Sequence, residues 1–143
     1  MSFAFMDIHH HILYGVDDGP KSCLEMFQML KAAYDDGVRT IIATPHIAPG
    51  IKPFNMEVLE SKVMDARWYC EQNGCDIEIH LGSEIFYNDY AERLLVEQKI
   101  PTMAGSNKVL LEFQDKVSYE GLERAIVTPL GRGLVPVRAH IGR

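Results

Sequence analysis

Short apolar segments alternate regularly with longer amphipathic ones along the sequence, and this pattern limits the folds that the chain can adopt. Residues 38–44 (VRTIIAT) are rich in β-branched side chains, which is typical of a buried strand. The pattern predicts strands over residues 3–13, 38–44, 77–85, 108–113 and 134–140. It predicts helices over residues 22–36, 56–72, 90–98 and 119–130. Strands that alternate with helices indicate βαβ crossovers and therefore an α/β fold with a mainly parallel sheet.

Local signals support two of these helices. Ser22 is expected to cap the first helix, with Glu25 completing a capping box and Gly37 ending the helix in a left-handed conformation. Asn55 precedes the second helix, in which Val58 and Tyr69 are expected to face inward together with Leu59, Val63 and Ala66.

The number of strands limits the architecture. A closed βα barrel usually needs roughly 200 residues or more, whereas this chain has 143 and supplies about five predicted strands. Residues 1–143 are therefore expected to form the N-terminal part of one domain, a partial βα barrel with parallel strands. An incomplete barrel would leave an open sheet edge, so self-association into a homo-oligomer is also expected.

Composition excludes several classes of function. The formal net charge of −6 disfavours broad attraction to nucleic acid or to anionic lipid. The sequence has no apolar segment long enough to insert into a membrane, and its amino terminus does not resemble a signal peptide. The three cysteines, Cys23, Cys70 and Cys75, form no paired framework, which favours reduced thiols in a cytoplasmic protein.

Histidines and acids gather where the predicted strands end. The carboxyl ends of parallel strands meet at one rim, so side chains placed there are expected to converge. Asp17 and Asp18 follow the first strand in a loop and could reach the same rim. The residues at the strand ends are His9, His11, His46, Glu84, Glu112 and His140.

These residue types indicate a metal site. Alternate residues of a strand share a face, so His9 and His11 can approach one ion while His10 points the other way. Mixed imidazole and carboxylate ligands favour Mn, Fe or Zn, and Glu84 is the central candidate for a carboxylate that bridges two ions. Such a site could hydrolyse a phosphate ester. A lone His-x-His is weak evidence, but Glu112 lies inside an apolar strand, where an unpaired acid is costly.

Several motifs carry a resemblance to a known family. The segments DIHHH (7–11) and VDDGP (16–20) resemble the opening of the PHP (polymerase and histidinol phosphatase) superfamily, and most closely its bacterial protein-tyrosine phosphatases of capsular and exopolysaccharide loci. The similarity continues through GVRTIIATPH (37–46), GSEIFY (82–87), KIPT (99–102), LLEF (110–113) and PVRAH (136–140), in the same order along the whole chain.

The resemblance implies a distorted βα barrel with a trinuclear, usually manganese-dependent, site. By the same resemblance, His9 and His11 match ligands of the first metal, Glu84 the bridging carboxylate, Glu112 and His140 ligands of the second metal, and Asp18 and His46 ligands of the third. Arg143 matches an arginine that holds the substrate phosphate.

Two departures from the family pattern affect the expected activity. Gly142 stands where the family usually has Glu, and no Asp-x-His motif follows His140 to complete two of the metal positions. The chain is therefore expected to be a C-terminally truncated, impaired member.

The function expected from the resemblance is hydrolysis of phosphotyrosine on a protein, namely a bacterial tyrosine kinase that regulates polysaccharide export. No Cys-x5-Arg signature of the thiol phosphatases is present. Two alternatives stay open: a small-molecule phosphatase of the histidinol-phosphate type, and a non-catalytic metal-binding module.

Overall fold

The computed structural model describes residues 3–140 of the chain. Contacts between residues divide the chain into two compact units. The first unit contains the residues up to Pro45 together with Asn55–Leu81, and the second contains His46–Phe54 and the residues from Gly82 onward. Each unit is described by itself.

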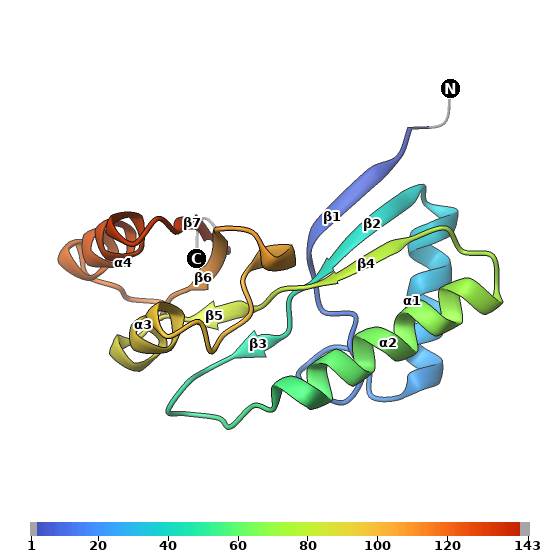
Figure 1. The fold of residues 1–143 in the computed structure, drawn as a ribbon, viewed down its shortest axis with the longest axis horizontal. Coiled ribbons are helices and arrows are strands. Elements are labelled where there is room, and N and C mark those ends of the chain that lie inside the picture. The colour runs from blue at the N-terminus through green and yellow to red at the C-terminus, as the bar shows by residue number, and fades with distance from the viewer. Residues whose placement is uncertain (1–2, 141–143) are drawn as a thin grey trace. The chain divides into compact units, whose positions relative to one another are not determined.

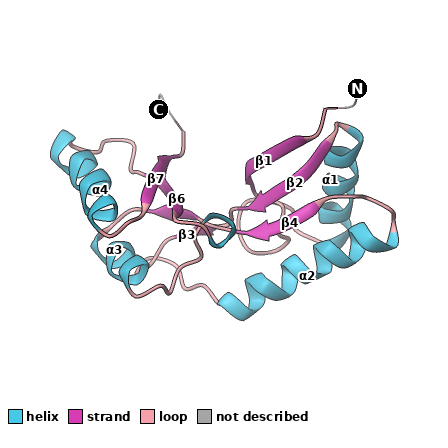
Figure 2. Cartoon of the chain, turned by 45° about the horizontal axis from the view of Figure 1, so that its top comes forward, coloured by secondary structure: helices cyan, strands magenta, loops and turns pink. Residues whose placement is uncertain are grey.

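The first unit is a parallel sheet with two helices on one of its faces (Figures 1 and 2). Its strand order is β1-β2-β4, and both neighbouring pairs are parallel. Helix α1 packs on β2, and helix α2 packs on β4 and on α1. The elements are β1 (Phe5–His10), α1 (Cys23–Asp35), β2 (Val38–Ala43), α2 (Met56–Gln72) and β4 (Glu78–Leu81).

The predicted start of α1 is confirmed, with one difference. The Ser22 side chain accepts a hydrogen bond from the Glu25 N–H (3.2 Å), as expected of an N-cap. The Glu25 carboxylate, however, accepts from the Lys21 N–H (2.5 Å) rather than from Ser22, so the predicted capping box is displaced by one residue. Gly37 has a φ of +93°, which confirms the predicted left-handed residue after the helix.

Helix α2 has the predicted bounds and its Asn55 cap, but its buried face was only partly predicted. Val58 is 44% exposed, so its predicted inward orientation is wrong. The buried residues repeat every three or four positions and form one face of the helix, and Val58 lies outside that face. They are Leu59, Val63, Ala66 and Cys70. Tyr69 is half-buried and stacks on Phe27 of α1, with ring centroids 4.2 Å apart.

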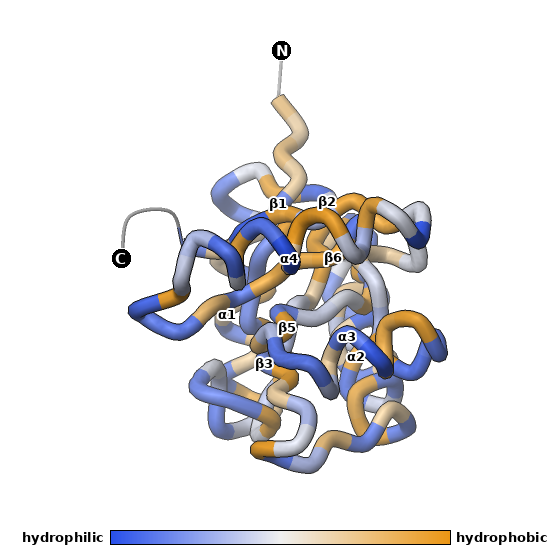
Figure 3. Tube along the Cα trace, turned by 90° about the vertical axis from the view of Figure 1, so that its left-hand side faces the viewer, coloured by the Kyte–Doolittle hydropathy of each residue, from blue (hydrophilic) through white to orange (hydrophobic). Residues whose placement is uncertain are grey.

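The second unit is a four-stranded parallel sheet in the order β3-β5-β6-β7. Helix α4 packs against β7, the sheet's edge strand. Hydrophobic residues run along β6 (Figure 3), where Val109, Leu110 and Leu111 are buried. The elements are β3 (His46–Ile47), β5 (Glu84–Phe86), α3 (Asp89–Val96), the 3-10 turn η1 (Met103–Gly105), β6 (Lys108–Glu112), α4 (Tyr119–Gly131) and β7 (Val135–Arg138).

The predicted strand over residues 77–85 is two strands in the structure. Strand β4 pairs with β2, whereas β5 pairs with β3 and β6, so the chain changes its hydrogen-bonding neighbours at Gly82 and Ser83. At this break between the two strands, the Ser83 hydroxyl donates a hydrogen bond to the Pro101 carbonyl oxygen (2.7 Å). A second short strand also follows Pro45, so residues 3–140 form seven strands where five were predicted.

The α/β class and the parallel strand arrangement predicted from the sequence are confirmed. Between residues 3 and 140, no helix combines the length and the apolar character needed to cross a membrane.

Candidate metal-binding site

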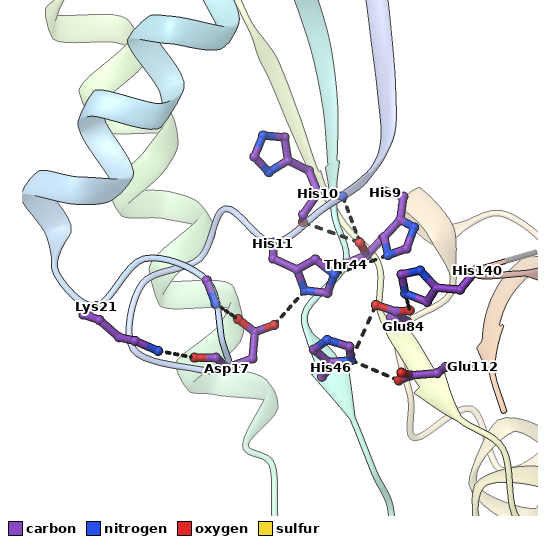
Figure 4. A network of polar contacts seen from close by, with 11 residues as sticks. His9, His10, His11, Asp17, Lys21, Thr44, His46, Glu84, Glu112 and His140 are labelled. Atoms are coloured by element: carbon purple, nitrogen blue, oxygen red, sulfur yellow. Dashed lines mark hydrogen bonds and ion pairs between the residues drawn. The ribbon is translucent and has the colours of Figure 1, made fainter. Parts of the chain in front are cut away.

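In the second unit, strand register places the candidate ligands beside one another. Glu84 begins β5 and is the register partner of His46 in β3. Glu112 ends β6 and is the register partner of Phe86, two residues along β5. His140 follows the end of β7, where the Ala139 N–H donates to the Leu111 carbonyl oxygen (2.8 Å). The predicted strand-end positions therefore bring these four side chains together (Figure 4).

Glu84 is the centre of this group. Its side chain has no solvent exposure, and burial of a carboxylate is costly unless cationic or donor groups surround it. The His140 Nε2 lies 2.8 Å from Glu84 Oε1, and the His46 Nδ1 lies 3.5 Å from Glu84 Oε2. His46 Nδ1 also lies 3.1 Å from Glu112 Oε2. One buried acid thus contacts two imidazoles, one from β3 and one from just after β7.

His140 has an uncommon backbone conformation. Its φ of +56° lies in the left-handed region, which side chains other than glycine seldom adopt. Such conformations persist where surrounding contacts over-determine them, and they are frequent at binding sites. The ring of His140 points at Glu84 in Figure 4.

This donor set fits a divalent metal. Ligand atoms from His46, Glu84 and Glu112 lie within 4.8 Å of one another, close enough to bind one ion. Two imidazoles and two carboxylates, counting His140, match the ligand preferences of Mn, Fe or Zn better than those of Ca or Mg. A buried carboxylate with two oxygens facing different imidazoles also has the geometry expected of a bridging ligand.

The first unit holds the His-x-His pair in place. His9 Nε2 and His11 Nε2 lie 3.3 Å apart, with their rings tilted by 59°. Two nitrogens bound to one ion at about 2.1 Å would lie roughly 3–3.5 Å apart, so the pair fits a shared metal. The buried Thr44 secures the strand between them, because its Oγ1 accepts from the His10 N–H (3.0 Å) and its own N–H donates to the His10 carbonyl oxygen (2.9 Å).

Asp17 and Asp18 differ sharply in burial, although their positions after the strand do not distinguish them and the family resemblance matched only Asp18 to a metal ligand. The Asp17 side chain is 3% exposed, and its Oδ2 lies 2.9 Å from His11 Nδ1. Asp18, the residue matched to a metal ligand, is exposed in the same loop. The sequence showed only that both acids follow the strand, and the burial of Asp17 depends on how the loop folds back.

The remaining histidines have other surroundings. His10 points away from His9 and His11, as predicted (Figure 4). Burial lowers the pKa of His10, and the charge of Asp7 opposes that shift in part. The His80 Nε2 lies 3.6 Å from a carboxylate oxygen of the exposed Glu78 on β4, and the structural role of His80 stays a prediction. Arg143, the predicted phosphate-binding residue, lies outside the described residues. Convergence of the ligands of the two units stays a prediction.

Comparison with known proteins decides the family. A family profile described as "Capsular polysaccharide synthesis, CpsB/CapC" matches residues 5–143. The chain belongs to the CpsB/CapC family. The resemblance found in the sequence motifs is therefore confirmed at the level of the family.

The CpsB/CapC relatives are tyrosine-protein phosphatases by name. The chain is 36% identical to "Tyrosine-protein phosphatase CpsB" of Streptococcus pneumoniae over 138 residues, which cover 96% of this chain and 57% of that protein. It is 30% identical to "Tyrosine-protein phosphatase YwqE" of Bacillus subtilis, covering 94% and 53%. The chain thus spans a little over half the length of these relatives.

A solved structure agrees with the fold. The chain superimposes with a TM-score of 0.86 and 26% identity on a structure from a study of YwqE from Bacillus subtilis and CpsB from Streptococcus pneumoniae, described as "unique metal-dependent tyrosine phosphatases". The match covers 95% of this chain and 55% of that one. The α/β fold with parallel sheets is therefore shared with that structure over about half of its length.

Proposed function

We propose that this chain carries metal ligands of a phosphotyrosine phosphatase and forms part of one PHP-type phosphoesterase domain. The proposal is based on the buried Glu84, which lies between His46 and His140, and on Glu112, which contacts His46. A buried acid among imidazoles suits a metal site better than a purely structural core. The names of the relatives supply the reaction class.

Each proposed ligand has a role that follows from its position. In the second unit, Glu84 would serve as the bridging carboxylate, Glu112 and His140 would be ligands of one ion, and His46 would be a ligand of another. In the first unit, His9 and His11 would hold an ion together, and Asp18 would be a further ligand from the loop. Arg143 is proposed to contact the substrate phosphate.

Divalent ions held by these residues would neutralise the phosphate oxygens and make bound water more acidic, which are the demands of phosphate-ester hydrolysis. The ion proposed is Mn, with Fe and Zn as alternatives. The protein's own contribution is to hold the ligands on rigid strand ends, so that little reorganisation is needed when a substrate binds.

The proposed substrate is a phosphotyrosine on a bacterial tyrosine kinase that regulates capsular or extracellular polysaccharide synthesis, and the proposed location is the cytoplasm. Support for the location comes from Cys23, Cys70 and Cys75, none of which forms a disulfide. No cysteine is needed as a nucleophile. Burial, with a smaller effect from Cys75, raises the pKa of Cys70 to about 11, which is the opposite of what an attacking thiolate requires.

The proposal is tested by the manganese-dependent release of phosphate from a phosphotyrosine peptide and from histidinol phosphate, measured side by side. Faster release from the phosphopeptide, lost in Glu84→Gln and retained in His80→Gln, is the expected result. A preference for histidinol phosphate would favour the small-molecule phosphatase. Metal binding without release from either substrate would favour a non-catalytic metal-binding module.

A further inference from the structure

The loop after β1 folds back onto the His-x-His segment and places Asp17 against His11. Asp17 Oδ2 lies 2.9 Å from His11 Nδ1, and the carboxylate is almost fully buried. On the other side of the same ring, His11 Nε2 lies 3.3 Å from His9 Nε2. The imidazole of His11 is thus held at both nitrogens (Figure 4).

These contacts select one tautomer of His11. An ionised carboxylate can only accept hydrogen bonds, so the nitrogen that faces Asp17 must be the one that carries the proton. In the neutral ring the proton then sits on Nδ1, and Nε2 keeps its lone pair. That lone pair points toward His9, where the spacing of the two Nε2 atoms suits a shared ion.

The loop is built to hold Asp17 in this position. Asp17 Oδ1 accepts from the Gly19 N–H (2.9 Å), so both carboxylate oxygens are engaged. A Cβ atom at Gly19 would overlap the backbone carbonyl of His11, and therefore only glycine allows the loop this close to the strand. The Gly15 N–H donates to the Pro20 carbonyl oxygen (2.8 Å) and closes the base of the loop.

We propose that Asp17 is a positioning residue that keeps the Nε2 lone pair of His11 available for metal. The inference rests on the proposed metal-binding function, in which His11 is a ligand, and it adds a residue to which neither the family motif nor the strand-end pattern gave this role. A carboxylate behind a ligating histidine fixes the ring and its tautomer, and loss of such a partner typically weakens metal affinity by about 10- to 100-fold.

The first test needs neither metal nor activity. Nitrogen-15 NMR of the metal-free 143-residue protein reports the tautomer of each histidine, and the His11 signals are identified by their absence in His11→Gln. At a pH where imidazoles are neutral, the wild-type protein is expected to show His11 protonated at Nδ1. A His11 protonated mainly at Nε2 would overturn the proposal, whether or not the protein is a phosphatase.

The second test exchanges the donor and acceptor roles in the hydrogen bond between residue 17 and His11 Nδ1. In Asp17→Asn the amide oxygen can still accept from the Gly19 N–H while the amide nitrogen donates to His11 Nδ1, so the His11 proton moves to Nε2. The expected results are this tautomer change and a Mn²⁺ affinity about 10- to 100-fold weaker by calorimetry.

The matched control is Asp65→Asn, which changes another partly buried aspartate of the first unit, hydrogen-bonded to the Tyr14 hydroxyl (2.9 Å). It should leave the His11 tautomer and the Mn²⁺ affinity unchanged. If Asp17→Asn keeps the wild-type tautomer and affinity, Asp17 is not a positioning residue. If Asp17→Asn does not fold, the wild-type NMR measurement alone decides the proposal.

Discussion

At the scale of single residues, the most informative feature is the burial of one acid. Glu84 has no solvent exposure, yet its carboxylate lies within 3.5 Å of two imidazole nitrogens, those of His46 and His140. Imidazoles are neutral over much of the physiological pH range and are good metal ligands, so this environment suits a metal ion better than a permanent ion pair.

Substitution of Glu84 should therefore affect metal binding more than substitution of a structural histidine. Glu84→Gln is expected to weaken Mn²⁺ binding by at least about tenfold, because an amide supplies one neutral oxygen in place of an anionic carboxylate. His80→Gln, beside the exposed Glu78, is the control and should bind Mn²⁺ like the wild type. Calorimetric titration measures both, and equal affinities in the two variants would remove Glu84 from the site.

The buried thiol of Cys70 gives a pH-dependent prediction. Burial raises the pKa of Cys70 to about 11 in the folded chain, above the usual value of about 8.5 for an unfolded chain. The folded state therefore holds the proton more tightly, so the contribution of Cys70 to stability is present below pH 8.5 and is lost as the pH rises toward 11. The difference between the two pKa values corresponds to at most about 3 kcal/mol.

Urea denaturation of the wild-type protein and of Cys70→Ala between pH 8 and 11 measures this effect. The wild type should lose stability more steeply over this range. Parallel losses in the two proteins would show that Cys70 ionises as readily in the folded state as in the unfolded one.

Residue types and spacing identified most of the candidate site, because strand ends converge in parallel sheets. His46, Glu84 and Glu112 were all named from their places after apolar runs, and the structure brings them together. Residue type and spacing could not predict that Asp17, rather than Asp18, contacts His11. It depends on a loop that returns to the strand, and such a return is set by Gly19 and by backbone hydrogen bonds rather than by periodicity.

At the scale of elements, helices were predicted better than strands. The α2 bounds and its Asn55 cap follow from local signals, since capping depends on neighbouring residues only. The break between β4 and β5 was missed, because β-branched and apolar residues continue on both sides of Gly82 and Ser83. Strand breaks depend on which neighbour supplies the hydrogen bonds, and that information is not local.

The two asparagine caps, Asn55 and Asn88, should contribute different amounts to the free energy of unfolding. Among the described residues, the Asn55 side chain accepts from the Val58 N–H (3.3 Å), whereas the Asn88 side chain accepts from the Ala91 N–H (2.8 Å) and also donates to the Pro49 carbonyl oxygen (3.0 Å). Asn55→Ala should cost about 1 kcal/mol of unfolding free energy, and Asn88→Ala about 2 kcal/mol because a second hydrogen bond is lost. Chemical denaturation measures both losses. An equal or smaller loss in Asn88→Ala would show that the hydrogen bond from Asn88 to the Pro49 carbonyl oxygen adds no stability.

At the scale of the whole molecule, the exposed edge of the first unit's sheet bears on assembly. Strand β1 is an edge strand, and three of its apolar side chains are largely exposed: Phe5 (56%), Met6 (63%) and Ile8 (46%). Edge strands with exposed apolar residues tend to pair with another chain. We therefore expect the protein to self-associate as its concentration rises.

Light scattering over a range of concentrations tests this expectation. Met6→Lys should shift the protein toward the monomer, because a charge on an edge strand opposes pairing. Glu78→Lys on β4, the opposite edge strand of the same sheet, places a lysine at an exposed position that is already polar and serves as the control. A wild-type protein that stays monomeric at all concentrations would contradict the prediction.

Whether Glu84 and its neighbours hold metal can be seen in an anomalous-diffraction map of a Mn²⁺-loaded crystal of this chain. The predicted result is a manganese peak within bonding distance, about 2.0–2.3 Å, of a Glu84 carboxylate oxygen, with an imidazole nitrogen of His140 or His46 as a further ligand. The same map shows whether His9 and His11 share an ion. A fully loaded crystal with no manganese peak beside Glu84 would show that Glu84 is not a metal ligand.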